Sequence, residues 1–297
     1  MEVRGLGLKG PRGWVFRDLS FSAGPGSLTA LEGPSGTGRT SLLLALTGRM
    51  RATEGTATVC GARLPRGLAP LRRVSAVAHV QGVTDLEPAL TVGEHLRERA
   101  LLQRRFGGSL RGLLGPRAER GSEARLRIDT ALAAAGLDSA ALPKGARTAV
   151  RDLERLEALR LSVALALIGC PLLLGVDDTD LKLPDAERAE AWAMLRSVAA
   201  SGTTVLAVCS EAPEDTQVVP TRAGAAQRDT PGTPDGHAQP DAAQTPGEGA
   251  QADAGEAPDR RAQADTAQAS AGAGGAAPTH DTGTKETGDA FAETRGA

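Results

Sequence analysis

Gly33-Pro34-Ser35-Gly36-Thr37-Gly38-Arg39-Thr40 is the segment of this chain that most strongly indicates its fold. An apolar strand-like run, Ser27–Leu31, precedes it, and an apolar helical run, Ser41–Gly48, follows it. A phosphate-binding P-loop consists, in order, of a strand, the pattern G-x-x-x-x-G, a basic residue, a hydroxyl residue and a helix. Its glycines let backbone N–H groups converge on a phosphate, and the helix N-terminus adds its positive dipole end. The segment is therefore expected to bind a nucleotide.

The motif also names the residues that would do the binding. The alternative, a glycine-rich turn without a ligand, is less consistent with the apolar strand before the loop and the apolar helix after it. The Thr40 hydroxyl, at the helix start, is a candidate Mg²⁺ ligand. The residues expected to cradle ATP are Gly33, Pro34, Ser35, Gly36, Thr37, Gly38, Arg39, Thr40 and Ser41.

A second motif is an apolar strand that ends in carboxylates. Leu172–Val176 is followed directly by Asp177 and Asp178. The carboxyl edge of a parallel sheet is where α/β proteins bind their ligands. The segment has the arrangement of a Walker B motif. This arrangement predicts that Asp177 holds the water shell of Mg²⁺ and that Asp178 faces the attacking water as the catalytic residue. The alternative is an acidic turn, since Asp-Asp-Thr-Asp is favourable turn chemistry.

The order of segments along the chain indicates an α/β fold. Strands alternate with helices, and two strands are apolar throughout, which is typical of a buried parallel sheet. Near the N-terminus two alternating runs around Gly-Pro-Arg-Gly predict a hairpin. The expected strands are 3–8, 14–21, 27–31, 56–60, 74–80, 172–176 and 203–208, and the expected helices are 41–48, 91–105, 152–169 and 186–200, with further helix within 97–150.

Composition changes sharply near residue 220. The 77 residues from Thr221 to Ala297 contain no Leu, Ile, Val or Met, and Phe291 is their one aromatic residue. Such a segment cannot bury enough apolar surface to offset its ordering entropy. We therefore predict one domain over 1–220, with a helical subdomain at about 91–160, and a disordered tail over 221–297. The tail carries 6 basic and 12 acidic residues, which leaves 28 basic and 24 acidic residues on the domain.

Several classes of protein do not fit this composition. A net charge of −2 and 2% aromatic residues argue against nucleic-acid binding. Three widely spaced cysteines without a CxxC pattern argue against a disulfide framework or a zinc site and fit a reducing cytosol. The first ten residues lack the apolar core of a signal peptide. The most apolar run, Leu161–Val176, is interrupted and too short to span a bilayer.

Four segments together resemble the ATP-binding cassette of ABC transporters, over about residues 2–212. Gly202–Ser210 is similar to the family's G-T-T-V-L-x-V-T-H segment. The resemblance implies a P-loop NTPase fold, an ABC-type nucleotide-binding domain with a small antiparallel β region and an α-helical subdomain. The chain is identified as a divergent, actinobacterial-type member. The other three matching segments are Ala30–Thr40 (Walker A), Leu90–Leu96 (the L-T-V-x-E-N-L segment) and Leu161–Asp178 (a helix, a Gly-x-Pro turn and Walker B).

The catalytic positions depart from the family pattern almost everywhere. Arg39 stands where the phosphate-binding lysine belongs, and a planar guanidinium does not replace a compact ammonium. The L-S-G-G-Q signature aligns with residues 153–157, where two glutamates replace uncharged residues and oppose a phosphate. The remaining departures are Gly82 or Gln81 at the Q-loop glutamine, Asp178 at the catalytic glutamate, Ser210 at the switch histidine and Gly10 near the base-stacking aromatic, for which Trp14 is a substitute or a core residue.

The resemblance implies a cytoplasmic ATP-binding subunit with Mg²⁺ as cofactor, weak or partner-dependent hydrolysis and peripheral membrane association through a partner. It implies a membrane-embedded transporter subunit as a separate chain, and a homodimer or a pairing with another cassette. One rival function is a non-hydrolysing regulatory or assembly subunit with ATP as a structural ligand; another is a P-loop enzyme such as a small-molecule kinase. Arg97–Arg127, with 9 arginines and 3 acids, is either a docking region for the membrane partner or a solvated helix face.

Overall fold

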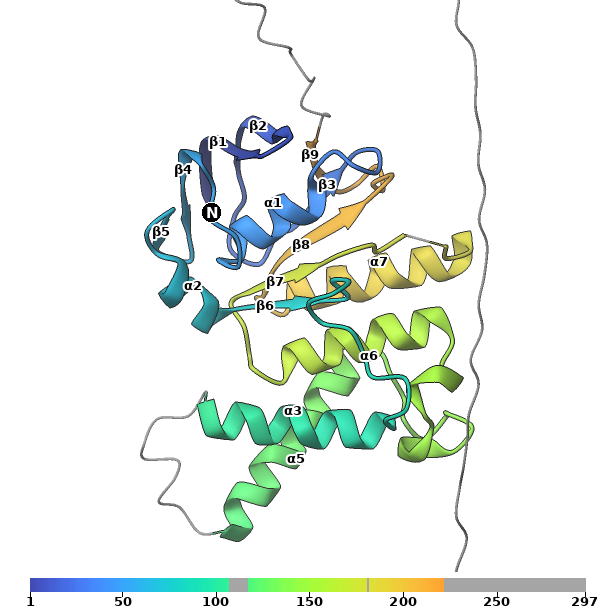
Figure 1. The fold of residues 1–297 in the computed structure, drawn as a ribbon. Helices are drawn as coiled ribbons and strands as arrows, with labels where there is room; N and C mark the ends of the chain where they lie inside the picture. Colours follow the sequence, from blue (N-terminus) through green and yellow to red (C-terminus); the bar gives the residue numbers. More distant parts are fainter. Residues whose placement is uncertain (107–116, 181, 222–297) are drawn as a thin grey trace, which may run out of the picture. The chain divides into compact units, whose positions relative to one another are not determined.

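A computed structural model of the chain describes residues 1–106, 117–180 and 182–221, and their strands lie in two sheets (Figure 1). The first sheet is antiparallel, in the order β2-β1-β4-β5. Its first two strands form the expected hairpin, with Gly10 opposite Gly13. The strands of this sheet are β1 (Glu2–Gly10), β2 (Gly13–Ser22), β4 (Glu54–Val59) and β5 (Ala62–Leu64).

The second sheet is parallel throughout, in the order β6-β7-β8-β3-β9. Every residue of β6, β7 and β8 is buried, as expected for strands that are covered on both faces. The α/β prediction is therefore confirmed. The strands are β3 (Leu28–Glu32), β6 (Ser75–Ala78), β7 (Leu173–Val176), β8 (Thr204–Cys209) and β9 (Gln217–Pro220).

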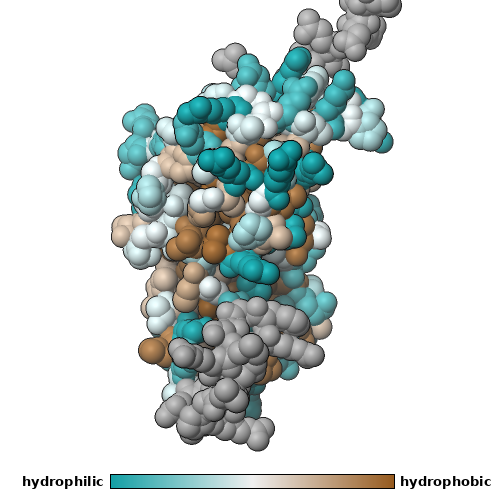
Figure 2. Space-filling model, turned by 90° about the vertical axis from the view of Figure 1, so that its left-hand side faces the viewer, coloured by the Kyte–Doolittle hydropathy of each residue, from teal (hydrophilic) through white to brown (hydrophobic). Residues whose placement is uncertain are grey.

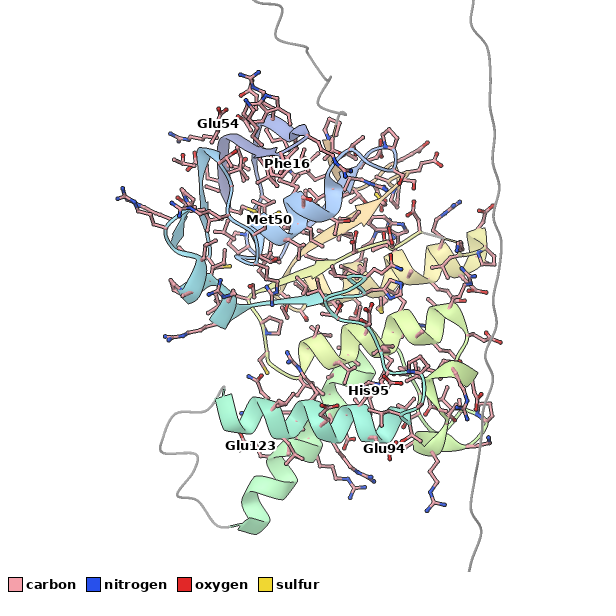
Figure 3. All side chains as sticks on the ribbon, in the orientation of Figure 1. Phe16, Met50, Glu54, Glu94, His95 and Glu123 are labelled. Carbon is pink, nitrogen blue, oxygen red and sulfur yellow. The ribbon has the colours of Figure 1, made fainter. Side chains whose placement is uncertain are left out.

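Successive residues of the parallel strands enter two different cores. Along β8, Val205 and Ala207 pack in one cluster and Leu206 and Val208 in the other, because side chains alternate across a strand. One cluster joins the sheet to α6 and α7, and the other joins it to α1 and the antiparallel sheet, where Phe16 is buried (Figure 3). The helices are α1 (Arg39–Leu46), α2 (Leu68–Val74), α3 (Val92–Phe106), α5 (Arg117–Ala134), α6 (Arg155–Leu167) and α7 (Asp185–Ala200).

Local signals in the sequence place most helix starts correctly. The backbone N–H of Thr91 donates to the Glu94 carboxylate at 2.8 Å, and the N–H of Glu94 donates to the Thr91 hydroxyl at 3.3 Å, which is the expected capping box. Three short elements, β5, α2 and β9, are not predicted from the sequence. They contain three to seven residues, too few for periodicity to identify them.

The predicted boundary after residue 220 excludes one residue that packs in the folded unit. Thr221, placed in the tail by composition, is 3% exposed, and its N–H donates to the Glu32 carbonyl at 2.7 Å. Composition could not show this, because a single threonine looks the same in a tail as at the end of a strand. The rest of the predicted tail, 222–297, lies outside the described residues.

Removing residues 225–297 tests the proposed tail while keeping Thr221. We expect the thermal unfolding midpoint to change by less than about 2 °C, because a segment without aliphatic side chains adds little buried apolar surface. Differential scanning calorimetry of the full and shortened chains measures the difference. A clear drop in the midpoint would show that the removed segment packs on the domain.

Candidate functional site

The glycine-rich segment forms the connection between β3 and α1, at the carboxyl edge of the parallel sheet. Gly36 and Gly38 have φ of +83° and +81°, a left-handed conformation that other residues adopt at a cost. At Gly38 a Cβ atom would lie 2.6 Å from the Val15 carbonyl oxygen, so β2 packs directly on the loop backbone. Conformation and packing therefore both require glycine at residue 38.

The N-terminus of α1 is open to a negatively charged ligand. Gly38 is its N-cap, no side chain caps it, and its first turn contains no acidic residue. The first amides of a helix have no partner within the helix, and its dipole is positive there. This end of α1 therefore has both the donors and the polarity that a phosphate needs.

Thr40 and Asp177, the two predicted Mg²⁺ ligands, lie together. Thr40 is in the first turn of α1, and Asp177 follows β7. The Thr40 hydroxyl donates a hydrogen bond to the Asp177 carboxylate. Burial raises the pKa of Asp177, and the hydrogen bond from Thr40 opposes that shift. A carboxylate that is only 3% exposed is costly without a partner, so this pair is suited to a cation.

Asp178 lies beside this pair and is half-buried. Its φ is +48°, and its N–H donates to Asp177 Oδ1 at 3.1 Å. Within the described residues its carboxylate makes no hydrogen bond or ion pair. The carboxylate is therefore available to orient a water, the role that the sequence predicts for it.

Arg39 makes a contact that the sequence did not indicate. Its Nη1 donates to the carbonyl oxygen of Cys209, at the end of β8. A guanidinium has five N–H donors, so this bond leaves others for a phosphate. It also ties the start of α1 to β8. A lysine ammonium lacks the branched geometry to make both kinds of contact in the same way.

His79, to which the sequence analysis gave no role, is at the same edge of the sheet. Ala78 pairs with Val176 in the parallel register, so His79 comes level with Asp177. Burial lowers the pKa of its imidazole, while the carboxylates of Asp178 and Asp177 partly oppose that shift. The expected strand 74–80 includes His79, whereas β6 ends at Ala78, so the sequence did not indicate that His79 lies at the edge of the sheet.

Gln81 and Gly82, the two candidates for the Q-loop position, lie in an exposed turn. The Gly82 N–H donates to both oxygens of Asp85, at 2.9 and 3.0 Å, which closes the turn locally. The pairing of β6 with β7 brings His79 level with Asp177. It does not bring Gln81 or Gly82 level with that residue.

The N-terminus of α6, where the signature segment was aligned, is closed by its own carboxylates. Glu154 is the N-cap and forms a capping box with Glu157, whose carboxylate accepts the Glu154 N–H at 2.9 Å. These carboxylates bind two of the amides at the helix start and place negative charge at the positive end of the dipole. The end of α6 is therefore unsuited to a phosphate, in contrast to the end of α1.

Asp180 and Cys209 lie near Ser210, the residue at the switch position. The Asp180 carboxylate accepts the N–H groups of Ser210 and Glu211, at 2.6 and 3.2 Å, and so holds the loop after β8. Burial raises the pKa of the Cys209 thiol to about 12, which excludes it as a nucleophile at neutral pH.

Trp14 has cations over its ring. The Arg17 guanidinium lies 4.6 Å and the Lys9 ammonium 5.6 Å from the ring centroid. These cation–π contacts give the half-buried indole a structural role on the antiparallel sheet.

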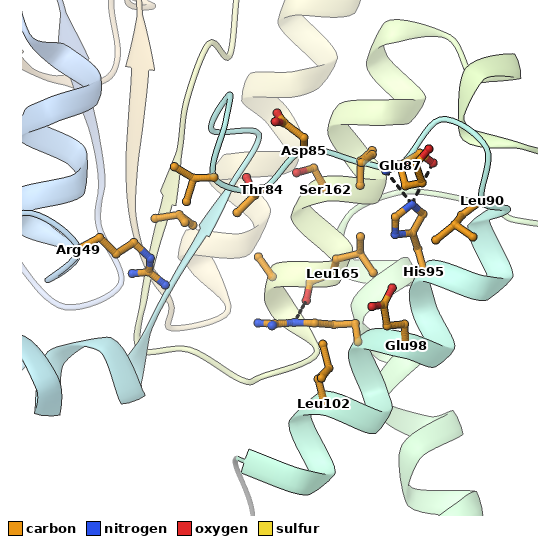
Figure 4. Close-up of a pocket in the computed structure, with 15 residues that line it drawn as sticks. Arg49, Thr84, Asp85, Glu87, Leu90, His95, Glu98, Leu102, Ser162 and Leu165 are labelled. Atoms are coloured by element: carbon orange, nitrogen blue, oxygen red, sulfur yellow. Dashed lines mark hydrogen bonds between the residues drawn. The ribbon is translucent and has the colours of Figure 1, made fainter.

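A second candidate site is a cavity of about 660 Å³ beside α3 and α6 (Figure 4). His95 on α3 is buried, and its Nε2 accepts the Glu87 N–H at 3.1 Å, which anchors the loop before α3. About one turn further along α3, Arg99 donates through Nε to the Leu165 carbonyl at 3.1 Å. Arg49 also lines the cavity, and burial lowers the pKa of both arginines. Neither of them forms an ion pair with a described carboxylate.

Exposed apolar side chains lie at this cavity as well. Leu102 on α3 is 43% exposed and Val83 is 52% exposed, and both line the cavity. Figure 2, which views the molecule from the side of β4, β5 and α2, shows apolar patches on a mostly hydrophilic surface. No described helix combines the length and hydropathy that crossing a membrane requires.

Known proteins resemble this chain in sequence and in structure. The family model described as "ABC transporter" matches residues 16–180. The Nod factor export ATP-binding protein I of Cupriavidus pinatubonensis is 34% identical over 65% of this chain and 53% of its own length. The protein of the same name from Ralstonia nicotianae is 32% identical over 69% of this chain and 58% of its own. The chain thus spans about half the length of the curated relatives it matches.

The structural comparisons agree on the fold. A dimeric ATP-binding cassette bound to ADP and Pi, in a post-hydrolysis state, matches with a TM-score of 0.54 and 19% identity, over 71% of this chain and 88% of that one. The protein cbiO1 of Clostridium perfringens, part of the ABC transporter complex cbiONQ, gives a TM-score of 0.56 and 17% identity, over 71% and 78%. With the family match over more than half of its residues, the chain belongs to the ABC transporter family and has the fold of its ATP-binding cassettes.

Proposed function

We propose that this chain binds Mg·ATP as the ATP-binding subunit of a transporter, with weak or partner-dependent hydrolysis. The observation that carries this function is the uncapped N-terminus of α1 beside the hydrogen-bonded pair Thr40 and Asp177. Mg²⁺ takes oxygen ligands and is held through one or two carboxylates together with substrate phosphates, so a hydroxyl and a carboxylate at a phosphate site fit it.

The residues of the site divide the work of binding. Backbone N–H groups of the segment 33–41 would hold the phosphates, except at Pro34, which has none, and at Gly33, whose N–H donates to the Cys209 carbonyl. Arg39 would add positive charge. Thr40 and Asp177 would hold Mg²⁺, which when bound neutralises charge on the phosphates. Asp178 would orient the water, and a carboxylate one methylene shorter than glutamate must lie closer to that water to reach it.

Several observations favour slow hydrolysis. Phosphoryl transfer depends mostly on positioning and charge stabilisation. Here Arg39 is bound to the Cys209 carbonyl, and the Gly82 amide is bound to Asp85. The α6 N-terminus is closed by Glu154 and Glu157. Removing one preorganised group commonly costs about 10²–10³ in rate, so changes at several positions should affect turnover far more than binding.

The same α6 capping box supports a second candidate function, a non-hydrolysing regulatory or assembly subunit that keeps ATP as a structural ligand. If α6 faces the nucleotide of a partner cassette, its carboxylates repel the phosphates there. Two copies of this chain would then form two impaired sites. A pairing with a different cassette, whose signature helix is uncharged, would leave these carboxylates at only one of the two sites.

A membrane-embedded partner is proposed to dock at the cavity beside α3 and α6. Leu102 and Val83 offer apolar contact there. Arg49 and Arg99, which lack ion-pair partners among the described residues, would donate hydrogen bonds to a carboxylate of the docking segment. Through this contact the chain would associate peripherally with a membrane. The arginine-rich segment Arg97–Arg127, a candidate docking region in the sequence, includes the turns of α3 that line the cavity. Its residues 107–116 lie outside the described residues.

Nucleotide binding should raise the unfolding midpoint of the full chain. At a Mg·ATP concentration 100 times Kd the stabilisation is about 2.7 kcal/mol. Thr40→Ala combined with Asp177→Asn should abolish the rise, because it removes both proposed Mg²⁺ ligands. The same chemical changes at exposed positions, Thr53→Ala with Asp152→Asn, should preserve it. The absence of any shift for the unmodified chain at millimolar Mg·ATP would refute the binding site.

Hydrolysis by the isolated chain should be well below 1 s⁻¹, the low end of ordinary enzyme turnover. Asp178→Asn should change this rate by less than about twofold, since the groups that work with Asp178 are altered. Phosphate release under saturating Mg·ATP measures both rates. Turnover of about 1 s⁻¹ or faster that Asp178→Asn removes would show a competent site.

The docking cavity is tested by a matched pair of leucine substitutions. Leu102→Glu should reduce recovery of a membrane protein with the tagged chain several-fold, because it places a charge on the proposed contact. Leu126→Glu on α5, where the leucine is 66% exposed, is the control and should have no effect. Co-purification from detergent-solubilised membranes, with the partner identified by mass, gives the readout. Equal recovery with both variants would place the partner elsewhere.

A further inference from the structure

Thr221, the last described residue, contacts the nucleotide loop from the far end of the chain. It follows β9, whose Pro220 pairs with Glu32 at the end of β3 (Figure 1). Its N–H donates to the Glu32 carbonyl at 2.7 Å, and its hydroxyl lies 2.9 Å from the same oxygen. Thr221 is thereby held at the point where β3 becomes the loop.

The hydroxyl of Thr221 also reaches into the loop. It lies 2.8 Å from the hydroxyl of Thr37, which lies 2.8 Å from the Pro34 carbonyl. Both threonines are almost completely buried, with 3% and 1% exposure. Each hydroxyl has one hydrogen, so one donates to the other and the second donates to a carbonyl, that of Pro34 or Glu32. Either arrangement links the loop to β3 and β9.

Packing at Gly33 supports the same link. A Cβ atom at residue 33 would lie 2.5 Å from both the carbonyl and the hydroxyl oxygen of Thr221, and 3.1 Å from the Thr37 hydroxyl. The first glycine of the loop is thus fitted against Thr221. The loop from Gly33 to Thr37 is therefore in contact with Thr221 at both of its ends.

We propose that Thr221 is a positioning residue for the nucleotide site. It holds Gly33–Thr37 in the conformation seen in this structure, so less ordering entropy is lost when a phosphate binds. This inference rests on the proposed ATP site and adds a residue from the segment that composition assigned to the tail. Thr221 contacts no phosphate itself and acts through Thr37 and Gly33.

Thr221→Val in the full chain removes the hydroxyl and keeps the shape. In this variant the N–H of residue 221 still donates to the Glu32 carbonyl, and the Thr37 hydroxyl still donates to the Pro34 carbonyl. The fold should therefore survive. We expect Mg·ATP affinity to fall about three- to tenfold, the range of a single lost hydrogen bond. Amide exchange at residues 33–38 should become faster in the nucleotide-free protein. Thr221→Ser should restore both properties to within about twofold.

Two controls separate positioning from general destabilisation. Thr204→Val removes a buried hydroxyl that accepts the Gly26 N–H at 3.1 Å, at the opposite end of β8, and should change neither affinity nor loop exchange. Thr37→Val combined with Thr221→Val should weaken binding less than the sum of the single changes, because both remove one contact.

The outcomes distinguish this inference from the proposed function. If the unmodified chain fails to bind Mg·ATP, the proposed function is wrong, and the exchange of residues 33–38 still decides the role of Thr221. Unchanged loop exchange in Thr221→Val overturns the inference. Equal loss of affinity in Thr221→Val and Thr204→Val overturns it as well, because the effect would then be one of stability alone.

Discussion

The parallel pairing of β7, β8 and β3 is the constraint on which the rest of the site depends. Val176 pairs with Ala207, and Glu32 pairs with Cys209, so these strands end at one edge of the sheet. The residues that follow each strand are therefore neighbours in space although they are far apart in the sequence. The register brings the Walker B carboxylates to the loop that follows β3, and the bond from Arg39 to Cys209 fastens the start of α1 to the same edge.

Two helix N-termini of this domain have opposite chemistry. The end of α1 has no acidic residue in its first turn and begins at a glycine. The end of α6 is capped by Glu154 and Glu157. A capping box stabilises its helix and at the same time removes the free donors and positive potential that an anion needs. The start of α1 thus has the free donors and the positive potential that a nucleotide phosphate needs. The start of α6 lacks them, and its carboxylates stabilise the helix.

The nucleotide loop is constrained by backbone and side chains from distant parts of the chain. Val15 on β2 packs against Gly38, and Thr221 after β9 packs against Gly33. Glycine is required at these two positions because other parts of the chain occupy the space of a side chain. The loop is therefore a product of the whole folded unit, from its second strand to its last described residue, as well as of its own sequence.

Local patterns in the sequence were enough to predict the loop, the buried strands and the pairing of Thr40 with Asp177. These features depend on local patterns, namely glycine spacing, apolar runs and a carboxylate directly after a strand. The positions of His79 beside Asp177 and of Thr221 against the loop follow only from the tertiary structure. His79 becomes a neighbour of Asp177 through the pairing of β6 with β7, and Thr221 reaches the loop through the pairing of β9 with β3. Strand order and register arise from packing across the sheet, and no local pattern in either segment encodes which strand will lie beside it.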